Sequence, residues 1–523
     1  MIPPEGLHSL LKPEAHDPPV DDVRLIQTHI SYVLLAGDFA YKIKKPVRFA
    51  FVDYSTLSLR REMCEREVQL NRRTCPDAYL GVQPIVERDG RSYLHGRGHT
   101  VDYAVKMRRL SAESCLANLI DQGEASPELL RRVADSVHIF HDAAARGGAI
   151  ARFGSANEVA AIWRENIGEI APFAGDSLAP DELRDIMSFG QQFLRANRSL
   201  IDQRASSGRA RDGHGDLRSD SIYIESGGHV CMTDCIEFSD RLRCGDVAGD
   251  IAFLTMDLDF RGRADLSDEF AGRYVELSPD DDTLPHLLPF FRCHRALVRG
   301  KVESITARER EIDEDQALEA RERARRYFAL ARRYATEEAP QTLVIVGGLS
   351  GAGKSHLAAA LAARIGAALV RSDAVRREMS GVPGAPAAAA NYSPEERAHV
   401  YEVARQRVRT HLETGRTVVF DATHLERRER DAARALATRA GVPALLTWVD
   451  APEDVILKRL DARDTYPDPI SDARPETFLA QRERMDALTE LERHDCVEVD
   501  GAEQATSNIA LIRAGRHGGH ACL

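Results

Sequence analysis

The chain has few aromatic residues and no surplus of positive charge. Phe, Trp and Tyr make up 6% of its 523 residues, and 82 acidic side chains outnumber 70 basic ones, which gives a formal net charge of −12. A protein with this charge repels nucleic-acid backbones except at a local basic patch. We therefore favour a small-molecule partner and keep nucleic acid as a less favoured alternative.

The sequence also lacks long apolar runs and a secretory start. No stretch approaches the roughly 18 apolar residues of a membrane-spanning helix. The opening residues, MIPPEGLHSLLKPEAHDPPV, contain prolines and acids where a signal peptide has a basic end and an apolar stretch. We expect a cytoplasmic protein with no membrane partner, and the sequence predicts no oligomeric state.

Cysteines are few, and their pattern indicates neither a disulfide framework nor a zinc site. Nine are scattered along the chain, an odd number that favours free thiols. Cys231, Cys235 and Cys244 are close in sequence but lack the paired CxxC spacing of zinc sites. We interpret them as small buried apolar residues.

Residues 1–338 have the pattern of an α+β domain with two lobes. The stretch SYVLLAGDFAYKIKK (31–45) predicts a hairpin, a long helix is expected at 57–73, and further strands at 80–87 and 99–110 precede helical segments. Strands first and helices afterwards are typical of this fold class.

Near residue 338 the pattern changes. A charged helix expected at 313–335 ends in TEEAPQ, and beyond it apolar strands alternate with helices. This alternation predicts an α/β domain with a parallel sheet. We therefore expect two domains, 1–338 and 339–523, and a loop at 381–394.

The second domain opens with a phosphate-binding motif. GGLSGAGKS fits GxxxxGK[ST] and lies between an apolar strand and a helix, as the mechanism of this loop requires. Its backbone N–H groups surround phosphate oxygens, its lysine contacts the β and γ phosphates, and its serine binds Mg²⁺. We assign ATP binding to Gly348, Ser350, Gly351, Ala352, Gly353, Lys354 and Ser355.

Carboxylates and arginines with roles in phosphoryl transfer follow this motif. Asp421 ends an apolar strand, from which a carboxylate can hold the metal. Asp373 follows another strand and can either accept the proton of a substrate hydroxyl or begin the next helix. Arg459 and Arg463, four residues apart, are either lid arginines that clamp the transferring group or a solvated helix face.

Residues 341 to about 503 resemble the P-loop kinases of the nucleoside-monophosphate-kinase and polynucleotide-kinase type, often grouped as AAA domain proteins. The loop motif, the SDxxR piece at Asp373 and the FDATH piece at Asp421 carry the resemblance. It implies a kinase that uses ATP and Mg²⁺, and it leaves the substrate open.

The first domain contains HGDLRSDS, which resembles a kinase catalytic loop. Asp216 stands where such loops orient the acceptor hydroxyl, and Ser221 where they place a metal-binding Asn. Asp234 follows a short strand, as the metal-binding Asp of kinases does. Lys42, in FAYKIKK, is the candidate phosphate-binding lysine, and Glu67 its expected ion-pair partner.

These motifs in this order make residues about 25 to 335 similar to the aminoglycoside-phosphotransferase branch of the protein-kinase-like fold, in which HGD replaces HRD. The segment with Asp246 and Asp250 resembles the one that follows the metal Asp in that family. The whole chain resembles bacterial bifunctional aminoglycoside phosphotransferase/ATP-binding proteins. Two departures are Ser221 and the lack of a glycine-rich loop before Lys42.

Together these features predict an ATP-dependent phosphotransferase that acts on a small hydroxyl-bearing molecule, with Lys354, Asp373 and Asp216 as catalytic residues. Two alternatives stay open. The basic helix YEVARQRVRTHLETGR (401–416) is compatible with a nucleic-acid end kinase. The departures in the first domain are compatible with an ATP-gated regulatory protein.

Overall fold

A computed structural model describes residues 4–49, 52–309, 312–337, 340–379, 393–462 and 475–517. The chain divides into two compact units. Met1–Ser126, Ile139–Ile162 and Asn197–Leu254 form the first, and Pro127–His138, Trp163–Ala196 and Thr255–Leu523 form the second. The predicted boundary between residues 338 and 339 and most of the loop expected at 381–394 lie outside the described residues.

The first unit contains a six-stranded antiparallel sheet in the order β1-β2-β3-β8-β6-β7. The predicted hairpin is confirmed, since β2 and β3 pair on either side of a two-residue turn at Gly37 and Asp38. The bounds are β1 Val23–Gln27, β2 Ser31–Ala36, β3 Phe39–Lys44, β6 Tyr79–Arg88, β7 Arg91–Tyr93 and β8 His99–Arg108. Helix α1 spans Pro4–Leu10, α2 spans Leu57–Asn71, and a short pair, β4 (Arg48–Phe49) and β5 (Val52–Asp53), lies between them in sequence.

Helices and two short antiparallel pairs make up the rest of the first unit. Strand β9 (Ala210–Asp212) pairs with β12 (Cys244–Asp246), and β10 (Ile222–Ile224) pairs with β11 (Val230–Met232). The predicted residues Asp216 and Ser221 lie between β9 and β10, and Asp234 lies between β11 and β12. The helices in this part of the sequence are α3 Leu116–Asp121, α4 Pro127–Ala143, α5 Gly148–Ala151, α6 Ala156–Ile170, α8 Arg198–Ser206, α9 Asp240–Arg243 and α10 Ala248–Phe260.

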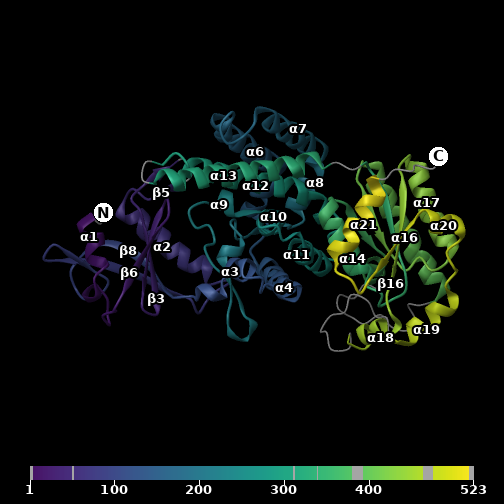
Figure 1. Cartoon of the computed structure of the whole chain (residues 1–523), viewed down its shortest axis with the longest axis horizontal. Helices are drawn as coiled ribbons and strands as arrows, with labels where there is room; N and C mark the ends of the chain where they lie inside the picture. The colour runs from purple at the N-terminus through teal and green to yellow at the C-terminus, as the bar shows by residue number, and fades with distance from the viewer. Residues whose placement is uncertain are drawn as a thin grey trace. The chain divides into compact units, whose positions relative to one another are not determined.

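The second unit contains a five-stranded sheet in the order β14-β15-β13-β16-β17, and every neighbouring pair is parallel. In Figure 1, helices α14 and α21 lie on one side of its strands and α16 and α17 on the other. The predicted α/β class is confirmed. The strands are β13 Leu343–Gly347, β14 Ala368–Arg371, β15 Val418–Asp421, β16 Ala444–Asp450 and β17 Cys496–Asp500.

The helices of the second unit begin well before this sheet in sequence. They are α7 Pro180–Ala196, α11 Ala264–Leu277, α12 Leu284–Thr306, α13 Glu314–Thr336, α14 Lys354–Ile365, α15 Ser372–Met379, α16 Pro394–Glu413, α17 Arg427–Ala440, α18 Glu453–Ala462, α19 Pro475–Arg484, α20 Glu490–His494 and α21 Ala505–His517. Helix α14 packs closely on α11, where a Cβ added to Gly272 would lie 2.9 Å from Cβ of Ala360. Glycine is therefore required at this contact.

One expectation about the cysteines is wrong. Cys75 and Cys231 are joined by a disulfide across 156 residues of sequence, although the sequence predicted free thiols. Cys235 and Cys244 are free and buried, as expected. Among the described helices, none combines the length and the apolar character that crossing a membrane requires.

Candidate active sites

The phosphate-binding loop follows β13 directly, and α14 begins at Lys354. Gly348, Gly351 and Gly353 all have positive φ, at 136°, 86° and 101°. Gly348 also passes so close to β16 that an added Cβ would lie 2.1 Å from the carbonyl oxygen of Val449. Only glycine accepts this combination of backbone conformation and close approach.

Side chains from three places in the chain meet at this loop. Nζ of Lys354 donates a 2.7 Å hydrogen bond to the carbonyl oxygen of Leu349. Gln481, on α19, accepts a hydrogen bond from the N–H of Ser350 and donates one to its hydroxyl, both at 2.9 Å. Nη2 of Arg459, on α18, donates to the carbonyl oxygen of Gly501 at 2.9 Å. No motif in the sequence indicated Gln481.

Asp421 ends β15 next to the loop and is buried. Burial raises the pKa of its carboxyl, although Lys354, Arg371 and a hydrogen bond with Ser355 oppose this. A buried carboxylate beside a serine hydroxyl provides the oxygen donors that Mg²⁺ prefers. Ser355 and Asp421 therefore fit the metal that the sequence predicts here.

Asp373 lies in the first turn of α15, which begins at Ser372 directly after β14. In the sheet, Arg371 is paired with Asp421, so the two strand ends are neighbours. Oδ1 of Asp373 accepts a 2.8 Å hydrogen bond from Arg376, and Asp373 also contributes to the raised pKa of Asp421. The structure thus brings the predicted base close to the predicted metal ligand.

The two predicted lid arginines have different outcomes. Arg459 is next to the phosphate-binding loop, because its Nη1 would lie 3.2 Å from a Cβ added to Gly353. Arg463 lies outside the described residues.

In the first unit, Lys42 contacts Glu67, its predicted ion-pair partner, and also Asp234, the predicted metal ligand. Its Nζ is 2.8 Å from Oδ1 of Asp234 and 2.9 Å from Oε1 of Glu67. Burial alone lowers the pKa of Lys42, but the two carboxylates raise it well above its ordinary value. Lys42 in turn holds the pKa of Asp234 below its ordinary value. The Lys–Glu–Asp arrangement expected of a kinase is present.

A second lysine, which sequence reasoning missed, supports this arrangement. Nζ of the fully buried Lys44 lies 2.6 Å from Oε2 of Glu67 and also forms an ion pair with Glu237. Glu237 accepts a hydrogen bond from the hydroxyl of Tyr54 at 2.5 Å. Glu67 therefore bridges Lys42 and Lys44. The repeated KIKK spacing was the available signal, because side chains 42 and 44 lie on the same face of a strand.

The HGD segment is fixed by Asp250. Its carboxylate accepts hydrogen bonds from the backbone N–H of His214 at 2.7 Å and of Gly215 at 2.8 Å, and it contacts His141 at 3.2 Å. Burial raises the pKa of Asp250, but these partners outweigh it and lower the pKa. Gly215 has φ +85°, and a Cβ there would lie 3.0 Å from Cα of Arg243, which explains why glycine follows the histidine.

Asp216 and Ser221 make contacts within their own segment. Oδ1 of Asp216 accepts a 3.0 Å hydrogen bond from Arg218. The hydroxyl of Ser221 donates to the carbonyl oxygen of Arg218 at 2.8 Å and accepts from its N–H at 3.2 Å. Asp216 is near enough to Asp234 to influence its pKa. The metal-binding role of Ser221 stays a prediction.

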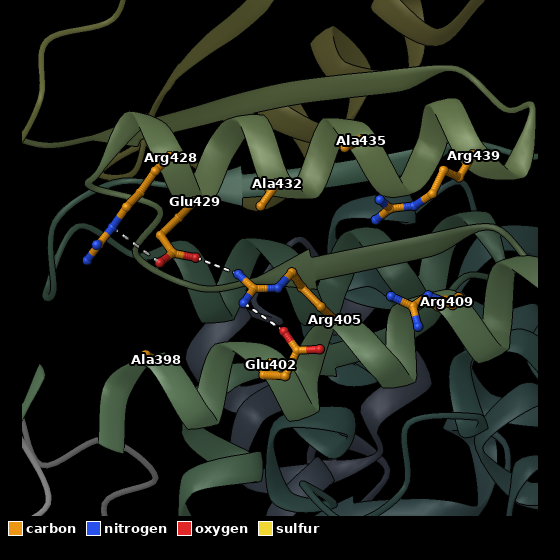
Figure 2. A pocket seen from close by; sticks show the side chains of 9 residues that line it. All are labelled: Ala398, Glu402, Arg405, Arg409, Arg428, Glu429, Ala432, Ala435 and Arg439. Atoms are coloured by element: carbon orange, nitrogen blue, oxygen red, sulfur yellow. Dashed lines mark hydrogen bonds and ion pairs between the residues drawn. The ribbon is translucent and has the colours of Figure 1, made fainter. Parts of the chain in front are cut away.

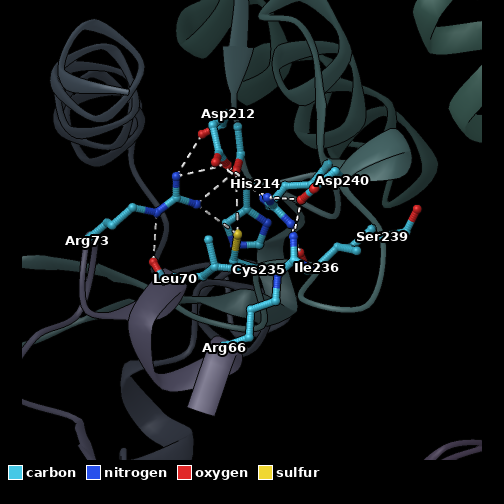
Figure 3. Close-up of polar contacts among 12 residues, drawn as sticks. Arg66, Leu70, Arg73, Asp212, His214, Cys235, Ile236, Ser239 and Asp240 are labelled. Carbon is cyan, nitrogen blue, oxygen red and sulfur yellow. Dashed lines mark hydrogen bonds and ion pairs between the residues drawn. The ribbon is translucent and has the colours of Figure 1, made fainter. Parts of the chain in front are cut away.

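Figure 3 shows how Arg73, two residues after the end of α2, contacts the strand that precedes the HGD segment. Nη1 of Arg73 donates to the carbonyl oxygen of Asp212 at 2.8 Å, and Nη2 donates to that of Gly213 at 3.1 Å. Arg243 also donates to the carboxylate of Asp212, at 2.7 Å. These contacts connect the segment after α2 to the segment that begins at Asp212.

Residues 343–488 match the family described as AAA domain. Two curated relatives are the uncharacterized protein Rv2004c of Mycobacterium tuberculosis and the uncharacterized protein Mb2027c of Mycobacterium bovis. Each is 34% identical over 454 residues, which cover 86% of this chain and 87% of the relative.

Solved structures give matches at low overall similarity. One is a GDP complex of aminoglycoside 2'-phosphotransferase-IIIa, with TM-score 0.34, 15% identity, and coverage of 62% of this chain and 99% of that chain. Another is a gluconokinase from Sinorhizobium meliloti 1021, with TM-score 0.26, 21% identity, and coverage of 35% and 94%.

Proposed function

The chain belongs to the family of these mycobacterial proteins, and we propose that it is an ATP-dependent phosphotransferase. The proposed reaction transfers the γ-phosphoryl group of ATP to a small hydroxyl-bearing molecule at the phosphate-binding loop of the second unit. The observation that carries this proposal is that neighbouring parallel strands end at the loop, at Asp373 and at Asp421. The proposed nucleotide site, metal ligand and base would thus share one edge of the sheet.

In this proposal the loop and the start of α14 hold the phosphates. The backbone N–H groups and the helix N-terminus favour anionic oxygens. Lys354 exchanges its hydrogen bond with Leu349 for the β and γ phosphates. Ser355 and Asp421 would hold Mg²⁺, whose positive charge would offset the negative charge of the phosphates.

Asp373 is proposed to accept the proton of the acceptor hydroxyl at a carboxylate oxygen. Its 2.8 Å contact with Arg376 keeps the carboxylate oriented. Arg459 and Arg463 are proposed to stabilise the charge on the transferring group. For Arg459, support comes from its place beside Gly353.

The first unit is proposed to bind Mg–nucleotide more readily than it transfers phosphate. Lys42, Glu67 and Asp234 support nucleotide binding, and Asp216 supports orientation of a hydroxyl. Ser221 provides a shorter and weaker metal ligand than the asparagine of related loops. We further propose that the protein works in the cytoplasm.

A screen of small hydroxyl-bearing acceptors with labelled ATP tests the proposal on the full chain. The parent is compared with Lys354→Ala, which disables the loop, and with Asp234→Asn, which disables the first unit. Transfer by the parent and by Asp234→Asn, but not by Lys354→Ala, is expected. The reverse pattern would assign the activity to the first unit. Transfer to oligonucleotide ends alone would favour the end-kinase alternative, and nucleotide binding without transfer would favour the regulatory one.

A further inference from the structure

A groove of about 390 Å³ lies between α16 and α17 of the second unit. Figure 2 shows its lining from close by. The volume lies in the range of small-molecule sites. Nine residues line it: Ala398, Glu402, Arg405, Arg409, Arg428, Glu429, Ala432, Ala435 and Arg439.

Small side chains make the space and long charged ones surround it. Ala432 and Ala435 are three residues apart on α17, so both face the groove, and Ala398 faces it from α16. Alanine leaves room between two packed helices where a larger side chain would fill it. All six remaining lining residues are charged, and the groove contains no aromatic ring for a base to stack on.

At one end of the groove the charges are balanced. Arg405 donates to Glu429 at 2.7 Å and to Glu402 at 3.0 Å. Arg428 lies 2.6 Å from Glu426 and 3.8 Å from Glu429. The dashed lines in Figure 2 mark the contacts among the drawn residues. Carboxylates therefore already neutralise the positive charges of Arg405 and Arg428 at this end.

At the other end the groove is lined by two arginines and no carboxylate. In Figure 2 the side chains of Arg409 and Arg439 both reach into the space between the two helices at this end. Nη1 of Arg409 donates to Oε1 of Gln406 at 2.7 Å, a neutral partner. Within the described part of the chain, neither guanidinium has an acidic partner.

Interaction with helix ends explains only part of this arrangement. Arg439 lies in the last turn of α17, where a positive charge is favourable. Arg409 precedes the last turn of α16, so the helix end does not explain its place at the groove. Two positive charges at one end of a groove favour binding of an anion there.

We propose that this end of the groove binds the phosphate group of a small phosphate-bearing molecule. Two planar guanidinium groups match the charge and the oxygen geometry of a phosphate dianion. The lack of an aromatic surface and the acidic residues at the balanced end disfavour a nucleic-acid strand. This site is separate from the phosphate-binding loop in its residues, and it goes beyond the proposed transfer reaction.

Inorganic tripolyphosphate is the probe. Its binding to the full chain is measured by calorimetry in a Lys354→Ala background, which weakens binding at the phosphate-binding loop. The test variant adds Arg409→Gln and Arg439→Gln. The matched control adds Arg434→Gln, on the same helix but outside the groove. Citrate serves as an anion without phosphate, and a single-stranded oligonucleotide as a polymer. Thermal melting confirms that each variant is folded.

The proposal predicts that tripolyphosphate binds the background protein and the control alike, and that the double change weakens binding about tenfold or more. Equal binding by the test variant, or no binding to the background protein, would overturn it. Citrate that binds as tightly through the same arginines would overturn the assignment to phosphate. If an oligonucleotide binds through these arginines and tripolyphosphate does not, the ligand of the groove is a nucleic acid and the proposal of a small molecule is wrong.

Discussion

Nζ of Lys42 lies 2.8 Å from Oδ1 of Asp234, so the lysine and the expected metal ligand of the first unit contact each other directly. Glu67 contacts the same Nζ atom at 2.9 Å, and Lys44 holds Glu67 from its other oxygen. In our proposal, Lys42 exchanges its contact with Asp234 for a metal–nucleotide. Ser221, as a weak metal ligand, limits the affinity of this binding.

Replacing Ser221 with Asn should tighten Mg-dependent nucleotide binding at the first unit by about tenfold, since an amide oxygen is a longer and stronger metal ligand than a hydroxyl. The change is measured by titrating Mg–ATP into full-length protein in the Lys354→Ala background. Adding Asp234→Asn should remove the gain. If affinity is unchanged with Mg²⁺ present, the hydroxyl that now contacts Arg218 is not a limiting ligand.

Replacing Asp373 with Asn should lower phosphoryl transfer by about 10² to 10⁴ while ATP affinity stays close to that of the parent. The carboxylate would act on the acceptor, and the nucleotide phosphates are held by the loop. Glu378→Gln, in the same helix, is the matched control. A parental transfer rate with a lower melting temperature would instead show that Asp373 only stabilises the first turn of α15.

His356, which follows Ser355, links α14 to α11. Its Nδ1 lies 3.1 Å from Oε1 of Glu276 and its Nε2 lies 3.4 Å from Oε2 of Glu269. Arg131 contacts both glutamates and His356. Burial lowers the pKa of His356, but the hydrogen bonds to Glu269 and Glu276 outweigh it and raise the pKa to about 9.

Because the folded-state pKa of His356 is above its unfolded value, its contribution to stability is complete below about pH 6.5 and is lost as pH rises through 9. Melting temperature measured from pH 6 to 10 should therefore fall across this range. His356→Gln should flatten the fall, and His399→Gln, at an exposed position, should leave it unchanged. The same pH dependence in His356→Gln would contradict this role.

The parts of both sites that could be predicted from the sequence rest on local patterns. The phosphate-binding loop is a continuous segment between a strand and a helix, so Lys354 and Ser355 follow from the spacing alone. Lys42 and Glu67 follow from the order of a strand and the next helix. Asp421 and Asp373 follow because the carboxyl ends of neighbouring parallel strands meet at one edge.

Contacts between distant segments could not be predicted in this way. Gln481 contacts Ser350 across 131 residues, and Glu237 contacts Lys44 across 193. No local period marks either partner. The disulfide between Cys75 and Cys231 was missed for the same reason, since the count of cysteines says nothing about which thiols the fold brings together.

In our proposal the phosphate-binding loop of the second unit is the site of turnover, and the rate of ATP turnover by full-length Lys354→Ala is the decisive measurement. Removing the ammonium that is proposed to contact the β and γ phosphates should lower the rate at least a hundredfold. The melting temperature and the circular dichroism spectrum should stay unchanged. Turnover at the parental rate in this folded variant would contradict the claim.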